Sequence, residues 1–240
     1  MHSHDGCRQR AKNYIENLRG DRMLKAVIFD MDGVIIDSEP IHFEIDKRIL
    51  RMCGINADDE MLLPYVGVTN PYMWNDLKQK YELPMSVDEL MKLQSDIKIQ
   101  VFSKSGLEAI DGIKELLADL KHHNIISAVA SSSPRFFIET VLKSTNIREF
   151  FSDILSGEEV ERGKPFPDIF LKTAEMLGVS PEECIVIEDS EHGVKAALAA
   201  GMKCIGFTNP NSGSQDLSRA SSIVSSISEL NYEYLRNIIG

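Results

Sequence analysis

Residues 24–33 read LKAVIFDMDG, a short run of apolar and β-branched residues that stops at an aspartate. Such a run is typical of a strand buried on both faces of a parallel sheet, where the alternation of polar and apolar positions is lost. Beyond residue 106, similar runs alternate with segments of helical periodicity. The expected strands there are 125–130, 151–155, 184–187, 203–207 and 222–225, and the expected helices are 111–123, 134–144, 167–177 and 191–200, with a last helix at the C-terminus. This alternation predicts an α/β fold with a parallel sheet flanked by helices.

Residues 40–106 have a different pattern. Apolar residues recur there at helical spacing, as in Ile41, Ile45 and Ile49, and no strand is expected. The chain is therefore expected to divide into an N-terminal extension, 1–22, an α/β core, 23–39 and 107–240, and a helical insert, 40–106. A Ser/Asn-rich stretch, 209–222, is expected to be a surface loop.

The composition describes a globular, acidic protein. With 37 acidic and 26 basic side chains, the chain carries a formal charge of −11, which disfavours a nucleic-acid or membrane-surface partner. A small phosphorylated molecule remains compatible if local cations neutralise it. Residues 1–22 lack the apolar segment of a signal peptide, and the four cysteines have neither disulfide nor metal spacing. A cytoplasmic location is therefore expected, while the sequence leaves the oligomeric state open.

Carboxylates follow two of the expected strands. Asp30 and Asp32 are two residues apart on extended backbone, so their side chains point the same way. Glu188 and Asp189 come directly after the strand 184–187. Ligands of open parallel sheets bind at the carboxyl ends of strands, and carboxylate oxygens from two such ends suit Mg²⁺. The alternative is structural: acids that cap the helix after each strand.

Two further chain segments supply groups that bind phosphate. Ser131, Ser132 and Ser133 follow the strand 125–130, and their hydroxyls could hold a phosphate or simply cap the next helix. Lys164 precedes a proline, which stiffens its loop, although most lysines are solvated surface charges. Carboxylates, hydroxyls and a lysine at four element ends together predict a phosphoryl-transfer site.

Four segments resemble, in order, the motifs of the haloacid dehalogenase superfamily. They are FDMDGVIIDSEP, VASSS, GKPFPDIF and VIEDSEHGVKAALAAGM, and the resemblance extends over residues 25–207. The helical insert resembles the small α-helical cap domain of that family, and the whole is most similar to its beta-phosphoglucomutase-like and sugar-phosphate phosphatase branch. The resemblance implies a Rossmann-like core, a Mg²⁺ cofactor and a small phosphorylated metabolite as substrate.

The resemblance also assigns a role to individual residues. Asp30 is the implied nucleophile, which forms an aspartyl-phosphate, and Asp32 is the general acid and then the general base. Ser131 and Lys164 are implied to hold the transferring phosphoryl group. The implied Mg²⁺ ligands are Asp30, Asp32 through its backbone carbonyl, Asp189, and Glu188 directly or through water. The implied substrate-binding residues are Ser132, His42, Gly67 and Asn70.

Three positions favour a phosphatase over a mutase. Val66 and Asn70 stand where the mutases have a lysine and an arginine for the distal phosphate, and Pro134 replaces a further lysine. Each lost charge-assisted contact removes about 1.5–3 kcal/mol of bisphosphate binding. A beta-phosphoglucomutase-like mutase is the alternative, with Arg135 or Lys78 as substitute cations. A non-catalytic phospho-ligand binding protein is less favoured because every motif residue is present.

Overall fold

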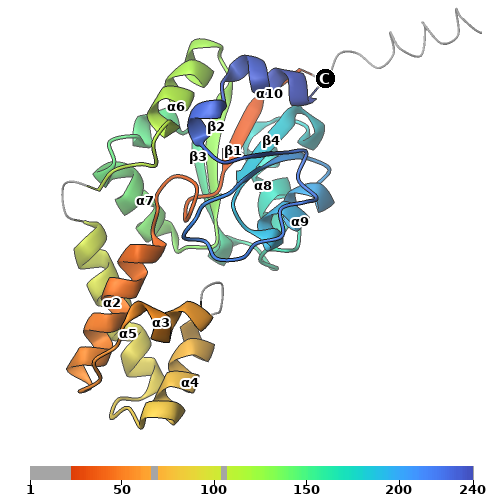
Figure 1. Cartoon of the computed structure of the whole chain (residues 1–240). Helices are drawn as coiled ribbons and strands as arrows, with labels where there is room; N and C mark the ends of the chain where they lie inside the picture. The colour runs from red at the N-terminus through yellow and green to blue at the C-terminus, as the bar shows by residue number, and fades with distance from the viewer. Residues whose placement is uncertain (1–22, 66–69, 104–106, 240) are drawn as a thin grey trace, which may run out of the picture.

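A single six-stranded sheet organises the computed structural model, which describes residues 23–65, 70–103 and 107–239 (Figure 1). The strands are β1 (Ala26–Phe29), β2 (Ile126–Ser131), β3 (Asp153–Ser156), β4 (Cys184–Glu188), β5 (Lys203–Phe207) and β6 (Ser222–Val224). Their order is β3-β2-β1-β4-β5-β6, and every neighbouring pair is parallel. The order in which the chain adds strands reverses at β1, because β2 and β3 lie on one side of it and β4, β5 and β6 on the other. Ligands of open parallel sheets bind in the crevice at such a switch point, which here lies between β1 and β4.

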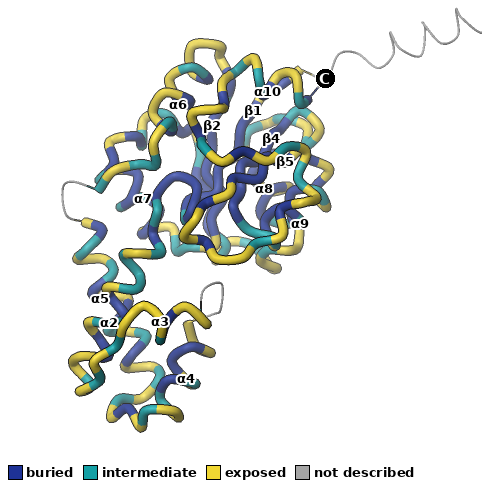
Figure 2. The backbone as a smooth tube through the Cα atoms, in the orientation of Figure 1, coloured by how far each residue is buried: buried dark blue, intermediate teal, exposed yellow. Residues whose placement is uncertain are grey.

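Helices cover both faces of this sheet. Those that follow the insert are α6 (Ile113–His122), α7 (Arg135–Ser144), α8 (Asp168–Leu177), α9 (Glu191–Ala199) and α10 (Tyr232–Ile239). Side chains of α6, α7 and α10 pack with Val27 and Phe29 of β1 in one apolar cluster. Side chains of α8 and α9 pack with Ala26 and Ile28 in the other. β1 is therefore buried on both faces, as Figure 2 shows, which explains its unbroken apolar run. The predicted α/β class is confirmed.

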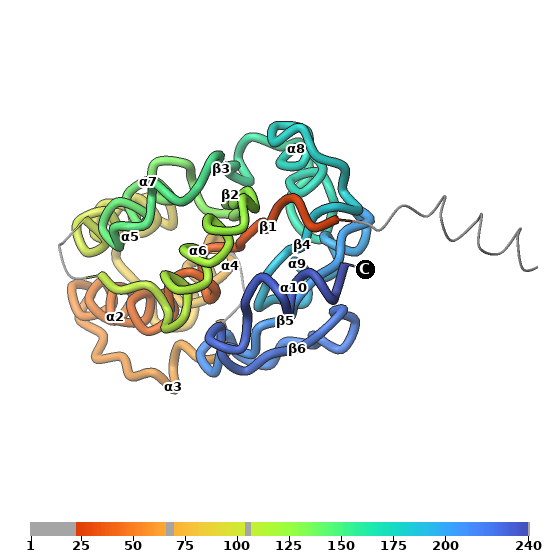
Figure 3. Tube along the Cα trace, turned by 90° about the horizontal axis from the view of Figure 1, so that it is seen from above, coloured from red at the N-terminus to blue at the C-terminus, as the bar shows by residue number. Residues whose placement is uncertain are grey.

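A helical unit is inserted between β1 and β2. It consists of α2 (Glu39–Met52), α3 (Asp59–Leu62), α4 (Asn70–Tyr81) and α5 (Val87–Phe102). In Figures 1 and 3 this unit lies to one side of the sheet, with α2 and α5 against each other. Its interior holds the fully buried Trp74, and Ser86 begins α5 with a capping box to Glu89. The predicted helical insert is thus present, and its packing requires no contribution from a strand.

Cys184 and Cys204 are buried, unpaired thiols in β4 and β5, as expected for small core residues. Within the described ranges, no helix is both long and apolar enough to cross a bilayer.

Candidate active site

A cavity of about 280 Å³ lies at the carboxyl ends of β1, β2 and β4. It is lined by Asp30, Asp32, Gly33, Ser38, Glu39, Ser131, Ser132, Lys164, Asp189, Ser190, Ser212 and Gln215. The structure therefore brings together residues from all four of the motif segments. In the sequence these residues are up to 159 positions apart, the separation of Asp30 and Asp189.

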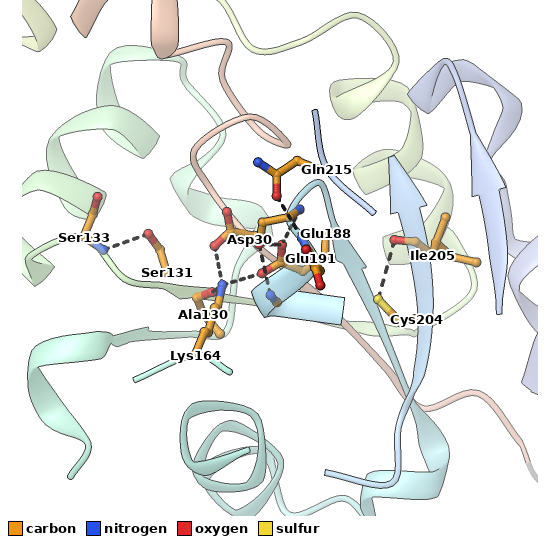
Figure 4. Close-up of polar contacts among 12 residues, drawn as sticks. Asp30, Ala130, Ser131, Ser133, Lys164, Glu188, Glu191, Cys204, Ile205 and Gln215 are labelled. Carbon is orange, nitrogen blue, oxygen red and sulfur yellow. Dashed lines mark hydrogen bonds and ion pairs between the residues drawn. The ribbon is translucent and has the colours of Figure 1, made fainter. Parts of the chain in front are cut away.

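Lys164 lies at the centre of the charged groups (Figure 4). Its Nζ is 2.6 Å from Asp30 Oδ1 and 2.6 Å from Glu188 Oε1, and it donates to the carbonyl of Ala130 at 3.2 Å. Only 7% of the side chain is exposed. Burial by itself lowers the pKa of an ammonium, but Asp30 and Glu188 outweigh it and raise the pKa of Lys164. Lys164 is therefore a buried cation of the site and not the solvated surface charge of the alternative interpretation.

Asp30, Glu188 and Asp189 form a compact acidic cluster. One carboxylate oxygen from each lies within 4.8 Å of the others, and all three residues are buried. Burial raises the pKa of Asp30 well above its usual value; Lys164 opposes this, and the two neighbouring carboxylates add to it. The pKa of Asp189 is raised to about 7, first by burial and then by Glu188. One lysine does not neutralise three buried carboxylates, so the donor set fits an added cation.

Hydroxyl groups fix the outer oxygens of this cluster. Ser190 Oγ donates to Glu188 Oε2 at 2.8 Å, and Ser212 Oγ donates to Asp189 Oδ2. Both Glu188 oxygens are thus engaged, one by Lys164 and one by Ser190. An oxygen-only site of this kind suits Mg²⁺, which keeps several waters. Because both of its oxygens are engaged, Glu188 is better placed to contact a metal ion through water than to ligate it directly.

Asp32 points away from the acidic cluster. Its Oδ2 accepts from Ser133 Oγ at 2.7 Å, and its Oδ1 lies 3.8 Å from His42 Nε2 with no hydrogen-bond partner among the described residues. Burial would raise the pKa of Asp32, but His42, Lys98 and Ser133 together lower it. Burial also lowers the pKa of His42, which makes the imidazole neutral near pH 7. The side chain of Asp32 is turned to His42 and is not part of the acidic cluster, so Asp32 could contribute to a metal site only through its backbone carbonyl.

Helix capping does not explain the polar residues at the strand ends. The N-cap of α7 is Pro134, which makes no side-chain cap, while Ser131 Oγ accepts from the backbone N–H of Ser133 at 3.1 Å. The N-cap of α9 is Ser190, whose side chain accepts from Gly193, so neither acid of that motif caps the helix. The capping interpretation of these segments was therefore wrong.

A second cavity of about 340 Å³ adjoins the first and is lined mostly by residues of the helical insert. Asp32 and Ser132 belong to both cavities, and the second is also lined by His42 and by Asn70, the exposed first residue of α4. Gly67 and its neighbour Val66 lie outside the described residues. Three of the residues that the resemblance implies as substrate-binding, Ser132, His42 and Asn70, thus line these neighbouring cavities.

Two groups of site residues were missed from the sequence. Gln94 and Lys98 line the second cavity from α5, where Gln94 interrupts the buried stripe of Leu90 and Ile97. A polar residue in that stripe is the signal that could have identified it. In addition, the expected surface loop 209–222 was a wrong prediction at its start, because Asn209 and Ser212 are buried.

Gly33 permits the close approach of Asp189 to the loop after β1. Gly33 has φ +80°, and a Cβ built there would lie 1.9 Å from Asp189 Oδ2. Gly33→Ala is expected to lower the free energy of unfolding by about 1–2 kcal/mol for the left-handed backbone and by a further roughly 1–3 kcal/mol for the displaced carboxylate. Gly54→Ala is the matched control, because Gly54 has φ +86° and open space around it. Equal losses for both variants in urea unfolding would contradict the proposed clash.

Comparison with known proteins finds similarity to one family. The family model for haloacid dehalogenase-like hydrolases matches residues 27–207. A phosphorylated carbohydrates phosphatase from Thermotoga maritima is 34% identical over 182 residues, which cover 76% of this chain and 84% of that protein. A beta-phosphoglucomutase from Bacillus subtilis is 32% identical over 218 residues, covering 88% and 94%. The crystal structure of a HAD family hydrolase from Deinococcus radiodurans with bound phosphate and sodium has a TM-score of 0.74 and 29% identity, covering 91% and 98%. The resemblance indicated by the four motifs is confirmed.

Proposed function

The chain belongs to the haloacid dehalogenase-like hydrolase family, and from this we propose that it is a Mg²⁺-dependent phosphatase that hydrolyses a small sugar phosphate through an aspartyl-phosphate on Asp30. The observation that carries the proposal is the position of Lys164, 2.6 Å from both Asp30 and Glu188 at the centre of the acidic cluster. This arrangement holds a carboxylate nucleophile beside the positive charge that a phosphoryl group requires.

The first step transfers the phosphoryl group to Asp30. Lys164 binds Asp30 Oδ1, so the other oxygen of Asp30 attacks phosphorus while the bond from phosphorus to the leaving oxygen breaks. Asp32 donates its proton to that leaving oxygen, which departs as an alcohol. Ser131 and Lys164 hold the phosphoryl oxygens as charge builds on them. In the second step, water attacks the aspartyl-phosphate, Asp32 accepts the proton of the water, and free phosphate and Asp30 result.

The charge environment of Asp32 suits both of these roles. In the free enzyme its pKa is lowered by His42 and Lys98, so it is ionised and ready to act as a base. A bound phosphate dianion places negative charge beside the carboxylate and raises its pKa, which favours protonation before the first step. Ser133 holds one oxygen of the carboxylate in place by a hydrogen bond, and His42 Nε2 lies 3.8 Å from the other oxygen.

The acidic cluster supplies the proposed Mg²⁺ site. Asp30, Asp189 and the backbone carbonyl of Asp32 would hold the ion directly, with Glu188 acting through water. When bound, the ion would neutralise the carboxylates and the phosphate together, so that an anionic substrate can approach an anionic nucleophile. Ser212 and Ser190 orient the two acids from β4 toward this position.

A phosphatase fits the available cations better than a mutase does. The substitute cations that the sequence offered for a second phosphate are engaged elsewhere. Arg135 pairs with Glu159 at 2.8 Å, and Lys78 Nζ donates to the backbone carbonyls that follow α4, at Leu83 and Met85. Neither residue lines either cavity. Lys98 is then the one lysine or arginine among the described residues that line the second cavity, which is less positive charge than retention of a bisphosphate intermediate requires.

Chelation of metal by EDTA is expected to stop turnover, and Mg²⁺ is expected to restore it, because the buried carboxylates otherwise repel the phosphate. Mg²⁺ is also expected to raise the thermal unfolding midpoint of the EDTA-treated protein, since an ion that binds only the folded state stabilises it. The measurements are phosphate release from an aryl phosphate and a thermal melt. Full turnover in EDTA would contradict the metal requirement.

The substrate class and the reaction type are tested together with a panel of sugar phosphates. Beta-glucose 1-phosphate is included with and without a sugar bisphosphate as primer, and both phosphate release and isomerisation are measured. Phosphate release without isomerisation supports the phosphatase, whereas isomerisation that depends on the primer supports the mutase. Folded protein without either activity supports the non-catalytic binding protein.

A further inference from the structure

The cavity in the helical insert is built to receive the leaving group of the substrate. It begins at Asp32, the proposed acid that protonates the leaving oxygen, and extends between α2, α4 and α5. Its volume of about 340 Å³ accommodates a molecule of the size of a sugar. Its apolar lining comes from Phe43, Leu62 and Met73.

A buried polar pair lies in this cavity. Asp46 of α2 is 5% exposed and Gln94 of α5 is 7% exposed. Gln94 Nε2 donates to Asp46 Oδ1 at 2.6 Å, and within the described parts of the chain Gln94 is the one hydrogen-bond partner of Asp46. A carboxylate can accept about four hydrogen bonds, and an amide offers one acceptor oxygen and two donor hydrogens. The pair therefore retains free capacity that faces the cavity.

The pair of Asp46 and Gln94 makes too few hydrogen bonds to be explained as structural support. A buried carboxyl group with a single neutral partner destabilises the fold unless further hydrogen bonds form. Burial accordingly raises the pKa of Asp46 to about 7, against the opposing effect of Gln94. A ligand that brings hydroxyl groups would complete the set.

The charges that surround the cavity exclude a second phosphate. Lys98 is the one lysine or arginine among the described residues that line it, and three acids, Asp32, Asp46 and Glu39, act on its charge. Glu39 also lines the cavity, and the pKa of His42 is lowered, which makes this imidazole neutral. A phosphate at this end would add its negative charge to that of the acids lining the cavity, with Lys98 as the one lysine or arginine among the described lining residues.

We propose that Asp46 and Gln94 form a hydroxyl-binding subsite, which selects an uncharged, polyhydroxylated leaving group and rejects one that carries a second phosphate. This inference rests on the proposed phosphatase function and assigns the recognition of the substrate to two residues outside the four motif segments. Hydroxyls of the leaving group donate to Asp46 and to the carbonyl oxygen of Gln94, and accept from the Gln94 amide. The apolar residues contact the carbon skeleton.

The test compares the wild-type enzyme with Asp46→Asn and Gln94→Met, both of nearly conserved volume. The substrates are a series of hexose and pentose monophosphates, fructose 1,6-bisphosphate, and p-nitrophenyl phosphate, whose leaving group has no sugar hydroxyls. Each variant is expected to lower the ratio of kcat/KM for the sugar monophosphates to kcat/KM for the aryl phosphate by about tenfold, which corresponds to one hydrogen bond to a charged group. Asp46→Asn is also expected to raise turnover of the bisphosphate relative to the monophosphates.

Asp96→Asn is the matched control, because Asp96 lies on the exposed side of α5 and undergoes the same chemical change. It is expected to leave both ratios unchanged. If one variant fails to fold, the other still tests the subsite. If the wild-type enzyme releases phosphate and the folded variants have the same kcat/KM ratios as the wild-type enzyme, the proposed subsite is wrong while the proposed function stands. Failure of the wild-type enzyme to hydrolyse any ester contradicts the proposed function instead.

Discussion

Asp30→Asn is expected to reduce phosphate release by at least roughly a thousandfold, because an amide cannot form the phosphoryl-enzyme intermediate. The remaining groups of the site stay in position, since Lys164 keeps its contact with Glu188. The fold is expected to survive as well, because the substitution removes one of three mutually repelling carboxylates. The measurement is turnover of an aryl phosphate with Mg²⁺ at saturation, together with the circular dichroism spectrum.

Asp111→Asn is the matched control, since Asp111 is exposed and lies just before α6, outside both cavities. It is expected to retain full turnover. A folded Asp30→Asn enzyme that keeps more than about a hundredth of the wild-type rate would rule out covalent catalysis by this residue. That outcome would move the attack to water and make Asp30 only a ligand of the metal.

The core and its site could be predicted from the sequence because buried parallel strands have a recognisable local sequence pattern. A strand buried on both faces is a continuous apolar run, and polar residues directly after it are placed at the carboxyl edge of the sheet. The segment after β1 shows this clearly, since Asp30 and Asp32 follow four fully buried positions. This pattern predicts that the ends of β1, β2 and β4 meet, even when no tertiary contact is known.

The second cavity, in the helical insert, could not be predicted from the sequence in the same way. Asp46 and Gln94 are 48 residues apart and become partners only through the packing of α2 on α5, which no local periodicity specifies. Lys98 of the insert contacts Phe137 of the core, with its Nζ 4.4 Å from the ring centre, and burial lowers the pKa of Lys98. Contacts between separately packed helical and sheet units depend on the angle at which the units meet, and that angle has no sequence signature.

The prediction of a surface loop for the Ser/Asn-rich segment was wrong at Asn209 and Ser212, because polarity is only an average indicator of exposure. Asn209 Nδ2 donates to the carbonyl of Gly33 at 2.9 Å, and Ser212 donates to Asp189. Buried polar groups are tolerated when they are hydrogen-bonded, and these two satisfy groups of the active site itself. The sequence shows the polarity of this loop but not its partners on the first and fourth motifs.

Lys164→Met is expected to lower the free energy of unfolding by about 3–5 kcal/mol near neutral pH, because removing one partner of a buried ion pair leaves charge uncompensated. Methionine has nearly the same volume, so the change removes charge without leaving a cavity. Both Asp30 and Glu188 lose their cation, and each lies in the interior. The measurement is urea unfolding in EDTA, which prevents a metal ion from replacing the lost ammonium.

The effect of Lys164→Met is expected to depend on pH with a definite sign. In the wild-type enzyme the pKa of Lys164 is raised, so its stabilisation is present at all pH values below its unfolded pKa and is lost only as pH rises through the folded value. In the variant, Asp30 lacks the ammonium that opposed burial, and its pKa rises further. A carboxyl group with a raised folded pKa stabilises at low pH and loses that contribution as pH rises. The difference between variant and wild type should therefore be small near pH 4 and should grow toward pH 8.

Lys25→Met provides the matched control for this experiment. Lys25 pairs with Glu183 at 2.7 Å, but 51% of its side chain is exposed, and water screens such a pair. Its removal is expected to produce only a small fraction of the Lys164→Met loss, with little change between pH 4 and 8. Mg²⁺ in place of EDTA is expected to recover part of the stability of Lys164→Met, because the ion neutralises the same carboxylates. Equal losses for the two lysine variants would mean that Lys164 stabilises the fold no more than a surface charge does, and the central ion pairs would then be insufficient to hold Asp30 ready for attack.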